Sequence, residues 1–148
     1  MKEPFDIYTN TVCACGGDIL FLEAVLESGG RVVVVPPLPL EKAIARSVAF
    51  AGSDWVERLR RVLADSSATV LEAECDETGE NDGIVYDFCN RYLAGLALLK
   101  ARQLGFPARG VCVWDGSESG LAGGTDSAVR LWRDAGMEVD AVEPEATE

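Results

Sequence analysis

Two short glycine turns contain the residues whose types and spacing could bind a ligand. The first, Cys15-Gly16-Gly17-Asp18, precedes an apolar stretch, and the second, Gly123-Gly124-Thr125, lies between a β-branched run and a helical pattern. Glycine lets the backbone approach a ligand closely, and a helix N-terminus presents unpaired N–H groups at the positive end of its dipole. Together the two turns predict a site for a phosphorylated or nucleotide-like ligand.

The candidate catalytic groups are carboxylates, because the chain contains no histidine. This excludes mechanisms built on Ser–His, Cys–His and His–metal pairs. Glu23 is the single charge within residues 19–26, and Asp115 directly follows a predicted strand. Either carboxylate could activate water or stabilise an oxocarbenium-like centre. Each also has a structural interpretation, Glu23 in a solvated helix stripe with Glu27 and Asp115 in a turn.

Three further residues are candidates for ligand contact. Tyr86 and Asn90 lie one helical turn apart and are predicted to face one rim, where Asn90 could bind a base or sugar edge. Arg46 follows a proline-rich loop and could neutralise a phosphate. The alternative interpretations are an amide on the helix surface and an ordinary solvated arginine.

Composition limits the partners and the compartment. The 148 residues carry a formal net charge of −12, which argues against binding to nucleic acid or to an anionic membrane surface. No apolar run is long enough to cross a bilayer. Five cysteines without a signal peptide indicate a reducing, cytoplasmic setting. Cys13 and Cys15 lack a second close cysteine pair, so no zinc site is predicted, and no cofactor is certain.

Strands and helices are predicted to alternate along the whole chain. Strands are predicted over 5–12, 31–35, 68–73, 110–114 and 138–142. Helices are predicted over 19–28, where Asp18 is the expected cap, and over 41–49, 55–64 and 125–135. A longer helix of roughly 20 residues is predicted to end at residue 103. Such alternation implies an α/β fold, a Rossmann-like three-layer sandwich with about five mostly parallel strands and a ligand beyond their carboxyl ends. We expect one domain over residues 1–142, followed by an acidic tail over 143–148.

The segment 15–24, the run 32–36 and Gly123-Gly124-Thr125 resemble, in order and spacing, the SLOG group of Rossmann-like domains. This group is related to the lysine-decarboxylase-like cytokinin phosphoribohydrolases and to the DNA-processing protein A family. Residues 15–132 are also similar to a domain of bacterial proteins that carry tetratricopeptide repeats or nucleotide-cyclase modules. The resemblance implies binding of a nucleotide, a nucleotide-derived second messenger or an NAD-like molecule, in some relatives with cleavage of an N-glycosidic bond.

Two differences from the related domains determine which functional hypothesis is preferred. The phosphoribohydrolases carry Gly-Gly-x-Gly-Thr followed by a glutamate, whereas here Asp126 follows Thr125 and the next glutamate is Glu138. The relatives also carry an upstream strand and helix that this chain is expected to lack, so a homodimer or a partner domain should cover a sheet edge. The leading hypothesis is therefore binding or sensing of a nucleotide-like ligand. The alternatives are a carboxylate-based N-glycosidic hydrolase and a non-catalytic interaction module.

Overall fold

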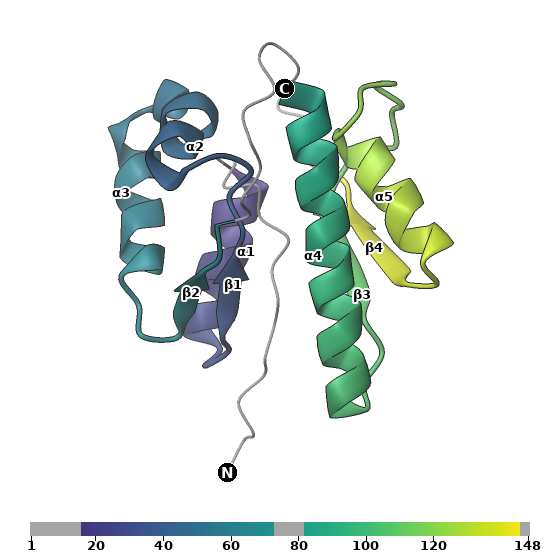
Figure 1. Cartoon of the computed structure of the whole chain (residues 1–148). Helices are drawn as coiled ribbons and strands as arrows, with labels where there is room; N and C mark the ends of the chain where they lie inside the picture. Colours follow the sequence, from purple (N-terminus) through teal and green to yellow (C-terminus); the bar gives the residue numbers. More distant parts are fainter. Residues whose placement is uncertain (1–15, 73–81, 146–148) are drawn as a thin grey trace. The chain divides into compact units, whose positions relative to one another are not determined.

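The structure, a computed structural model, describes residues 16–72 and 82–145. The chain divides into two compact units, Met1–Glu77 and Thr78–Glu148, here called the N-terminal and C-terminal units. Both units alternate helices with parallel strands (Figure 1). The α/β class predicted from the sequence is therefore confirmed for the described residues.

Within residues 16–72, the N-terminal unit contains two parallel strands and three α-helices. Its elements are α1 Gly17–Glu27, β1 Val32–Val34, α2 Leu40–Ser47, the 3₁₀ turn Ala49–Ala51, α3 Ser53–Leu63 and β2 Ala68–Val70. β1 pairs with β2 in parallel, with Val32 opposite Ala68 and Val34 opposite Val70. The valine run forms the strand that its β-branched side chains favour, and the fully buried Pro36 and Pro37 follow it.

The core of the N-terminal unit lies between α1, α3 and β1. Ile19 and Leu22 of α1 and Leu59 of α3 are fully buried, and they pack with Val32 and Val34. Burying each of these side chains contributes about 1.5–3 kcal/mol relative to leaving it exposed. This apolar face explains why Ile19, Leu22 and Val25 recur at three-residue spacing along α1.

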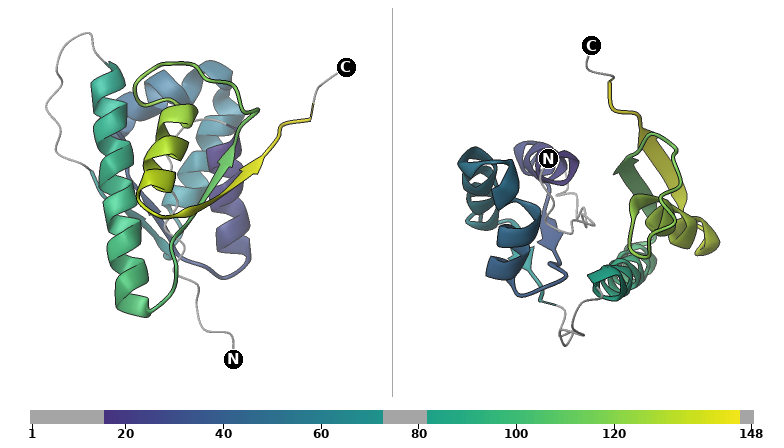
Figure 2. Two further views of the ribbon diagram at one scale, coloured as in Figure 1. Left: turned by 90° about the vertical axis from the view of Figure 1, so that its right-hand side faces the viewer. Right: turned by 90° about the horizontal axis from the view of Figure 1, so that it is seen from above.

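The C-terminal unit contains a second parallel strand pair and two helices. Its elements are α4 Asp82–Leu104, β3 Arg109–Val113, α5 Thr125–Asp134 and β4 Glu138–Val142. β3 pairs with β4 from Arg109 opposite Glu138 to Val113 opposite Val142. α5 packs on both strands and α4 packs beside α5 (Figure 2). Trp132 and Val129 of α5 and Ala94 of α4 are buried in this core.

The structure agrees with most of the predicted elements and differs on the sheet. The helices predicted over 19–28, 41–49, 55–64 and 125–135 are found with small shifts of their ends, and the strand over 138–142 is found unchanged. The predicted strand over 5–12 lies outside the described residues. The four described strands form two separate parallel pairs, so a single five-stranded sheet is not observed.

One capping prediction is wrong. Asp18 was predicted to cap the first helix, but the N-cap of α1 is Gly16, with φ +88°, and no side chain caps this end. Asp18 lies in the first turn instead, where its negative charge suits the positive end of the helix dipole. The amide of Leu20 donates to the carbonyl of Gly16 at 3.1 Å and closes this turn.

Candidate functional site

The glycine loop before α5 rests directly on the first turns of α4. Gly123 has φ +81°, and a Cβ atom there would lie 2.5 Å from the Cβ of Tyr86 and 3.0 Å from the amide nitrogen of Asp87. The buried side chain of Asn90 donates from its amide nitrogen to the carbonyl of Gly123 at 3.4 Å. The structure therefore brings together Tyr86, Asn90 and Gly123, which the sequence predicted to meet at one rim. Here Asn90 binds the loop backbone.

A buried carboxylate fixes the other side of this loop. Asp126 is 6% exposed, and it accepts hydrogen bonds from the Ser119 hydroxyl at 2.8 Å and from the Gly120 amide at 3.2 Å. The Ser119 bond, helped by the N–H groups of Gly120 and Ser127, lowers the pKa of Asp126, although burial opposes this shift.

The N-terminus of α5 thus already holds an anion from the chain itself. Helix α5 begins at Thr125 as predicted, but Gly124 is its N-cap and no side chain supplies a cap hydrogen bond. The carboxylate of Asp126 lies in the first turn, where its negative charge suits the positive end of the helix dipole. An anionic ligand at this end of the helix would meet the like charge of Asp126, so additional cationic groups farther along α5 become important.

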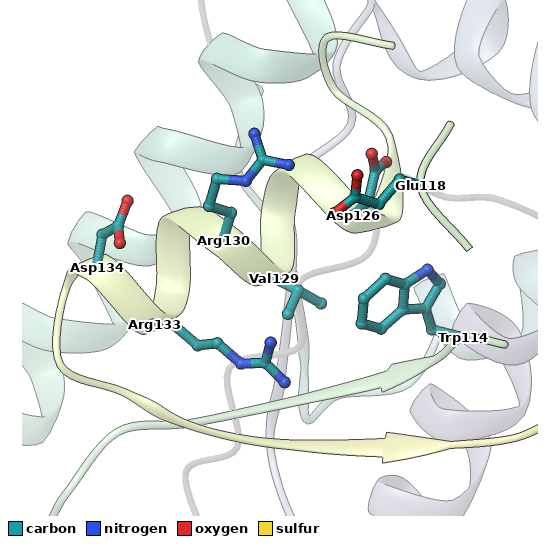
Figure 3. A pocket seen from close by; sticks show the side chains of 7 residues that line it. All are labelled: Trp114, Glu118, Asp126, Val129, Arg130, Arg133 and Asp134. Atoms are coloured by element: carbon teal, nitrogen blue, oxygen red, sulfur yellow. The ribbon is translucent and has the colours of Figure 1, made fainter. Parts of the chain in front are cut away.

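Such groups line a surface depression beside α5 with a volume of about 170 Å³ (Figure 3). Its lining residues come from the end of β3, the following loop and α5: Trp114, Glu118, Asp126, Val129, Arg130, Arg133 and Asp134. Small-molecule pockets usually enclose about 300–1,000 Å³, so this depression suits one part of a ligand.

The depression combines an aromatic ring and two arginines with three carboxylates, those of Glu118, Asp126 and Asp134. Trp114 directly follows β3, and its indole N–H donates to the carbonyl of Ser117 at 2.8 Å, which orients the ring. Arg130 and Arg133 lie three residues apart on α5 and are exposed. Over residues 16–72 and 82–145, neither guanidinium forms an ion pair. Both are therefore available to an anion from solvent.

The structure places Asp115 in a turn beyond the end of β3. Its carboxylate accepts from the Ser117 amide at 2.9 Å, and hydrogen bonds from Ser117 lower the pKa of Asp115. The side chain is exposed. This is the Asx-turn geometry by which aspartate stabilises tight turns. The observed contacts therefore agree with the interpretation of Asp115 as a turn residue.

Glu23 forms an ion pair within the N-terminal unit. Arg58 of α3 donates from both Nε, at 2.9 Å, and Nη2 to the Glu23 carboxylate, and its guanidinium carbon lies 4.6 Å from the ring centre of Trp55. The hydrogen bonds from Arg58 lower the pKa of Glu23. The bidentate pair joins α1 to α3, and it explains a charged residue in an otherwise apolar stretch.

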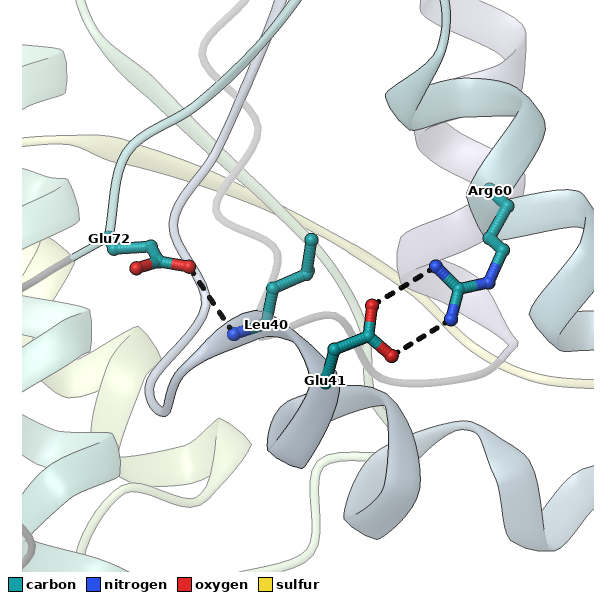
Figure 4. Close-up of polar contacts among 4 residues, drawn as sticks. All are labelled: Leu40, Glu41, Arg60 and Glu72. Atoms are coloured by element: carbon teal, nitrogen blue, oxygen red, sulfur yellow. Dashed lines mark hydrogen bonds and ion pairs between the residues drawn. The ribbon is translucent and has the colours of Figure 1, made fainter.

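The remaining predicted residues of the N-terminal unit lie at helix ends. Gly16 and Gly17 begin α1, and Arg46 is exposed in the last turn of α2. Cys15 lies outside the described residues. Glu72, which follows β2, accepts from the Leu40 amide at 3.5 Å at the start of α2 (Figure 4).

A second bidentate pair supports this region. Arg60 of α3 donates to both carboxylate oxygens of Glu41, at 3.2 and 2.9 Å, and these bonds lower the pKa of Glu41 (Figure 4). Because both side chains are mostly exposed, the pair orients α2 on α3 more than it stabilises the unit.

Sequence reasoning missed the depression residues Trp114, Arg130 and Arg133. Trp114 is partly buried against the core of this unit, and neither arginine was a candidate in the sequence. A usable signal was present, because two arginines at helical spacing follow the glycine loop in a chain with a net charge of −12.

Comparison of the chain with protein-family models, with curated proteins and with solved structures gives no match. Among the described residues, no group of three His, Cys, Asp or Glu side chains is placed to hold a metal ion. Over the same residues, no helix combines the length and the apolar character needed to cross a membrane. The function is therefore argued from the site alone.

Asp126→Asn is expected to lower the melting temperature at neutral pH and to flatten the acid dependence of stability. The pKa of the folded carboxyl lies below its ordinary value of 3.8, because the Ser119 hydroxyl and backbone N–H groups bind the charged form. Such a group contributes its full stability above the unfolded pKa, and the contribution disappears as the pH falls through the folded pKa. Thermal unfolding at acid and at neutral pH, monitored by circular dichroism, measures the difference in melting temperature between the variant and the unsubstituted chain.

Asp134→Asn is the matched control, because it removes the same charge from an exposed residue of the same helix. The unsubstituted chain and the control should lose stability in parallel below about pH 4, where carboxylates protonate. Equal acid profiles for all three proteins would show that the Asp126 contacts do not stabilise the loop.

Proposed function

We propose that this chain binds a nucleotide or a nucleotide-derived phosphorylated small molecule at the depression beside α5. The observation that supports this most directly is the grouping of Trp114, Arg130 and Arg133 around one hollow at the carboxyl end of β3. Ligands of α/β folds bind beyond the carboxyl ends of parallel strands. The location of this hollow therefore supports the proposal.

Each part of the proposed ligand has a partner of suitable chemistry. Guanidinium groups bind phosphate oxygens in a bidentate manner, and Arg130 and Arg133 offer two such groups within one helical turn. The Trp114 ring offers an apolar face for a base, as aromatic side chains do in nucleotide sites. The hollow also contains the carboxylates of Glu118, Asp126 and Asp134, so the phosphate is expected at the two guanidinium groups, which are the cationic part of the lining.

The contacts of the two candidate catalytic residues favour binding over hydrolysis. Glu23 is neutralised by Arg58, and Asp115 is engaged with Ser117 in its turn. Hydrogen bonds from Arg58 and Ser117 lower the pKa of the two carboxyls, which makes each carboxylate a weaker base toward water. The proposal is therefore a binding or sensing domain.

The proposal extends to the fold, the family and the location of the protein. We propose that the two parallel strand pairs are parts of one Rossmann-like sheet of about five strands, as helix–strand alternation implies. Assignment to the SLOG group and a cytoplasmic location are proposed with it. Among the described residues, Cys89 and Cys112 form no disulfide, which agrees with a reducing compartment.

A thermal-shift screen followed by calorimetry tests the binding proposal. AMP, ADP, NAD and inorganic phosphate are the probes, because a ligand that binds the native state raises the melting temperature by mass action. We expect at least one nucleotide to raise it, and phosphate alone to bind more weakly. Arg130→Gln and Arg133→Gln should each weaken binding roughly tenfold, because one charge-assisted hydrogen bond contributes about 1.5–3 kcal/mol.

Arg102→Gln is the matched control. Arg102 is an exposed arginine in the last turn of α4 and does not line the depression. Its replacement should leave nucleotide affinity unchanged. Failure of every nucleotide to stabilise the protein at millimolar concentration would contradict the proposal, and so would equal losses in all three arginine variants.

A further inference from the structure

The depression beside α5 is lined by more negative than positive side chains. Its cationic groups are Arg130 and Arg133, and its carboxylates are those of Glu118, Asp126 and Asp134. Two positive and three negative groups give this lining a formal charge of −1. A site that bound any phosphorylated ligand by charge alone would gather cations, so the excess of carboxylates has to act on which ligand can enter.

The carboxylates lie on both sides of the two arginines. Along α5, Asp126 lies one turn before Arg130, and Asp134 directly follows Arg133. Figure 3 shows Glu118 and Asp126 at one end of the hollow and Asp134 at the other. A phosphate held by the two guanidinium groups therefore has a carboxylate beyond it in either direction along the helix.

These carboxylates keep their negative charge. In the part of the chain that the structure describes, the side chains of Glu118 and Asp134 form no ion pair. Asp126 accepts hydrogen bonds from the Ser119 hydroxyl and the Gly120 amide, and neither donor carries a charge. Carboxyl groups are ionised at neutral pH, so all three repel any negative charge placed beside them.

A bound metal ion is the other use that a phosphate site makes of carboxylates. Mg²⁺ binds one or two carboxylates together with phosphate oxygens of the ligand. Among the described residues, however, no three His, Cys, Asp or Glu side chains are grouped as a metal ion requires. The separation of Asp134 from the other two carboxylates in Figure 3 agrees with this finding. Repulsion is therefore the role that the arrangement favours.

We propose that Glu118, Asp126 and Asp134 restrict the ligand of this hollow to a nucleotide with a single phosphate group. The inference rests on the proposed function, because it concerns the ligand of the same hollow. Two guanidinium groups match the roughly two negative charges that one phosphate monoester carries at neutral pH. Each further phosphate adds a negative charge for which the lining offers no cation and which the carboxylates repel.

Calorimetry of the full chain with AMP, ADP and ATP tests the proposal. EDTA is present, so that no divalent cation neutralises the phosphates, and GMP, GDP and GTP form a second series with another base. We expect each added phosphate to raise the dissociation constant roughly threefold to sixfold, the repulsion of two unit charges about 4–6 Å apart in bulk water. Equal or tighter binding of the triphosphates would overturn this inference and leave the proposed function intact. Failure of every nucleotide to bind would overturn both.

Two substitutions test the carboxylates themselves. Glu118→Gln and Asp134→Asn each remove one charge and keep the shape of the side chain, and both residues are exposed. Each should tighten ATP binding relative to AMP binding by roughly threefold to sixfold. Asp126 is left unchanged because it also holds Ser119 and Gly120 of the loop.

Glu138→Gln is the matched control. Glu138 is an exposed glutamate of the same unit, and it does not line the depression. Its replacement changes the net charge of the chain by the same amount, so it should leave the ratio of the ATP and AMP dissociation constants unchanged. An equal change of this ratio in all three variants would overturn the proposal, and so would an unchanged ratio in Glu118→Gln and Asp134→Asn.

Magnesium distinguishes repulsion from metal binding. With MgCl₂ in place of EDTA, the cation neutralises part of the charge of ATP in solution, so the difference between ATP and AMP should become smaller in every variant. Tighter binding of ATP than of AMP that required both magnesium and the Glu118 carboxylate would assign the carboxylates to a metal ion. That result would overturn the proposed restriction.

Discussion

Gly123→Ala is expected to destabilise the C-terminal unit by about 2–4 kcal/mol, through left-handed strain and a close contact together. Gly123 has φ +81°, a conformation that side chains with a Cβ atom rarely adopt. The added Cβ would lie 2.5 Å from the Cβ of Tyr86, 3.0 Å from the Asp87 amide and 3.1 Å from the Gly83 carbonyl. Two of these neighbours are backbone atoms of α4, so the contact cannot be relieved by rotating a side chain.

Gly120→Ala separates the backbone strain from the close contact. Gly120 lies in the same loop with φ +68°, but a Cβ atom there would meet nothing within 4 Å. Its replacement should therefore cost only about 1–2 kcal/mol, the penalty for the left-handed conformation. Urea unfolding monitored by tryptophan fluorescence in a Trp55→Phe background, which leaves Trp114 and Trp132, reports on this unit. Equal losses in the two variants would show that the loop does not rest on α4 as described.

Gly123→Ala should also weaken nucleotide binding if the loop and α5 form the proposed site. The loop connects Trp114 to the start of α5, so its displacement changes the spacing between the indole ring and Arg133. A stability loss without any loss of affinity at a temperature where the protein is folded would place the ligand elsewhere.

Trp132→Ala is expected to cost about 3–5 kcal/mol, as large-to-small substitutions of buried aromatic residues do. Trp132 is 5% exposed and packs with Val129 and Met137 between α5 and the β3–β4 pair. Its ring lies directly over Gly110, where a Cβ atom would come within 2.5 Å of Cε3. The glycine in β3 therefore accommodates the ring, and the two residues should be energetically coupled.

A double-mutant cycle measures this coupling. Gly110→Ala should cost about 1–3 kcal/mol in the unsubstituted chain, because it overpacks the core beneath Trp132. In the Trp132→Ala background the same substitution should cost close to nothing, which gives a coupling energy of about 1–3 kcal/mol. Urea unfolding of the four proteins, followed by circular dichroism, supplies the values. Additive effects within about 0.5 kcal/mol would contradict the observed packing.

Local patterns in the sequence determined the elements of this protein. The valine run predicted β1, the apolar run that ends at Gly29-Gly30 predicted α1, and the patterns after the second glycine turn predicted α5 and β4. These signals are local, because β-branched side chains, apolar periodicity and glycine breaks act over a few residues. That Tyr86 and Asn90 share one face of α4 was also predictable, since one helical turn separates the two side chains.

Contacts between residues distant in sequence were decided only by the tertiary structure. Glu23 forms an ion pair with Arg58 across a separation of 35 residues, and this pair joins α1 to α3. Asp126 satisfies its buried carboxylate with Ser119 and Gly120, which no spacing rule anticipates. The pairing of strands depends in the same way on packing across the whole unit. Sequence periodicity specifies which face of an element is apolar, whereas the partner of a charged or polar group depends on which elements pack together.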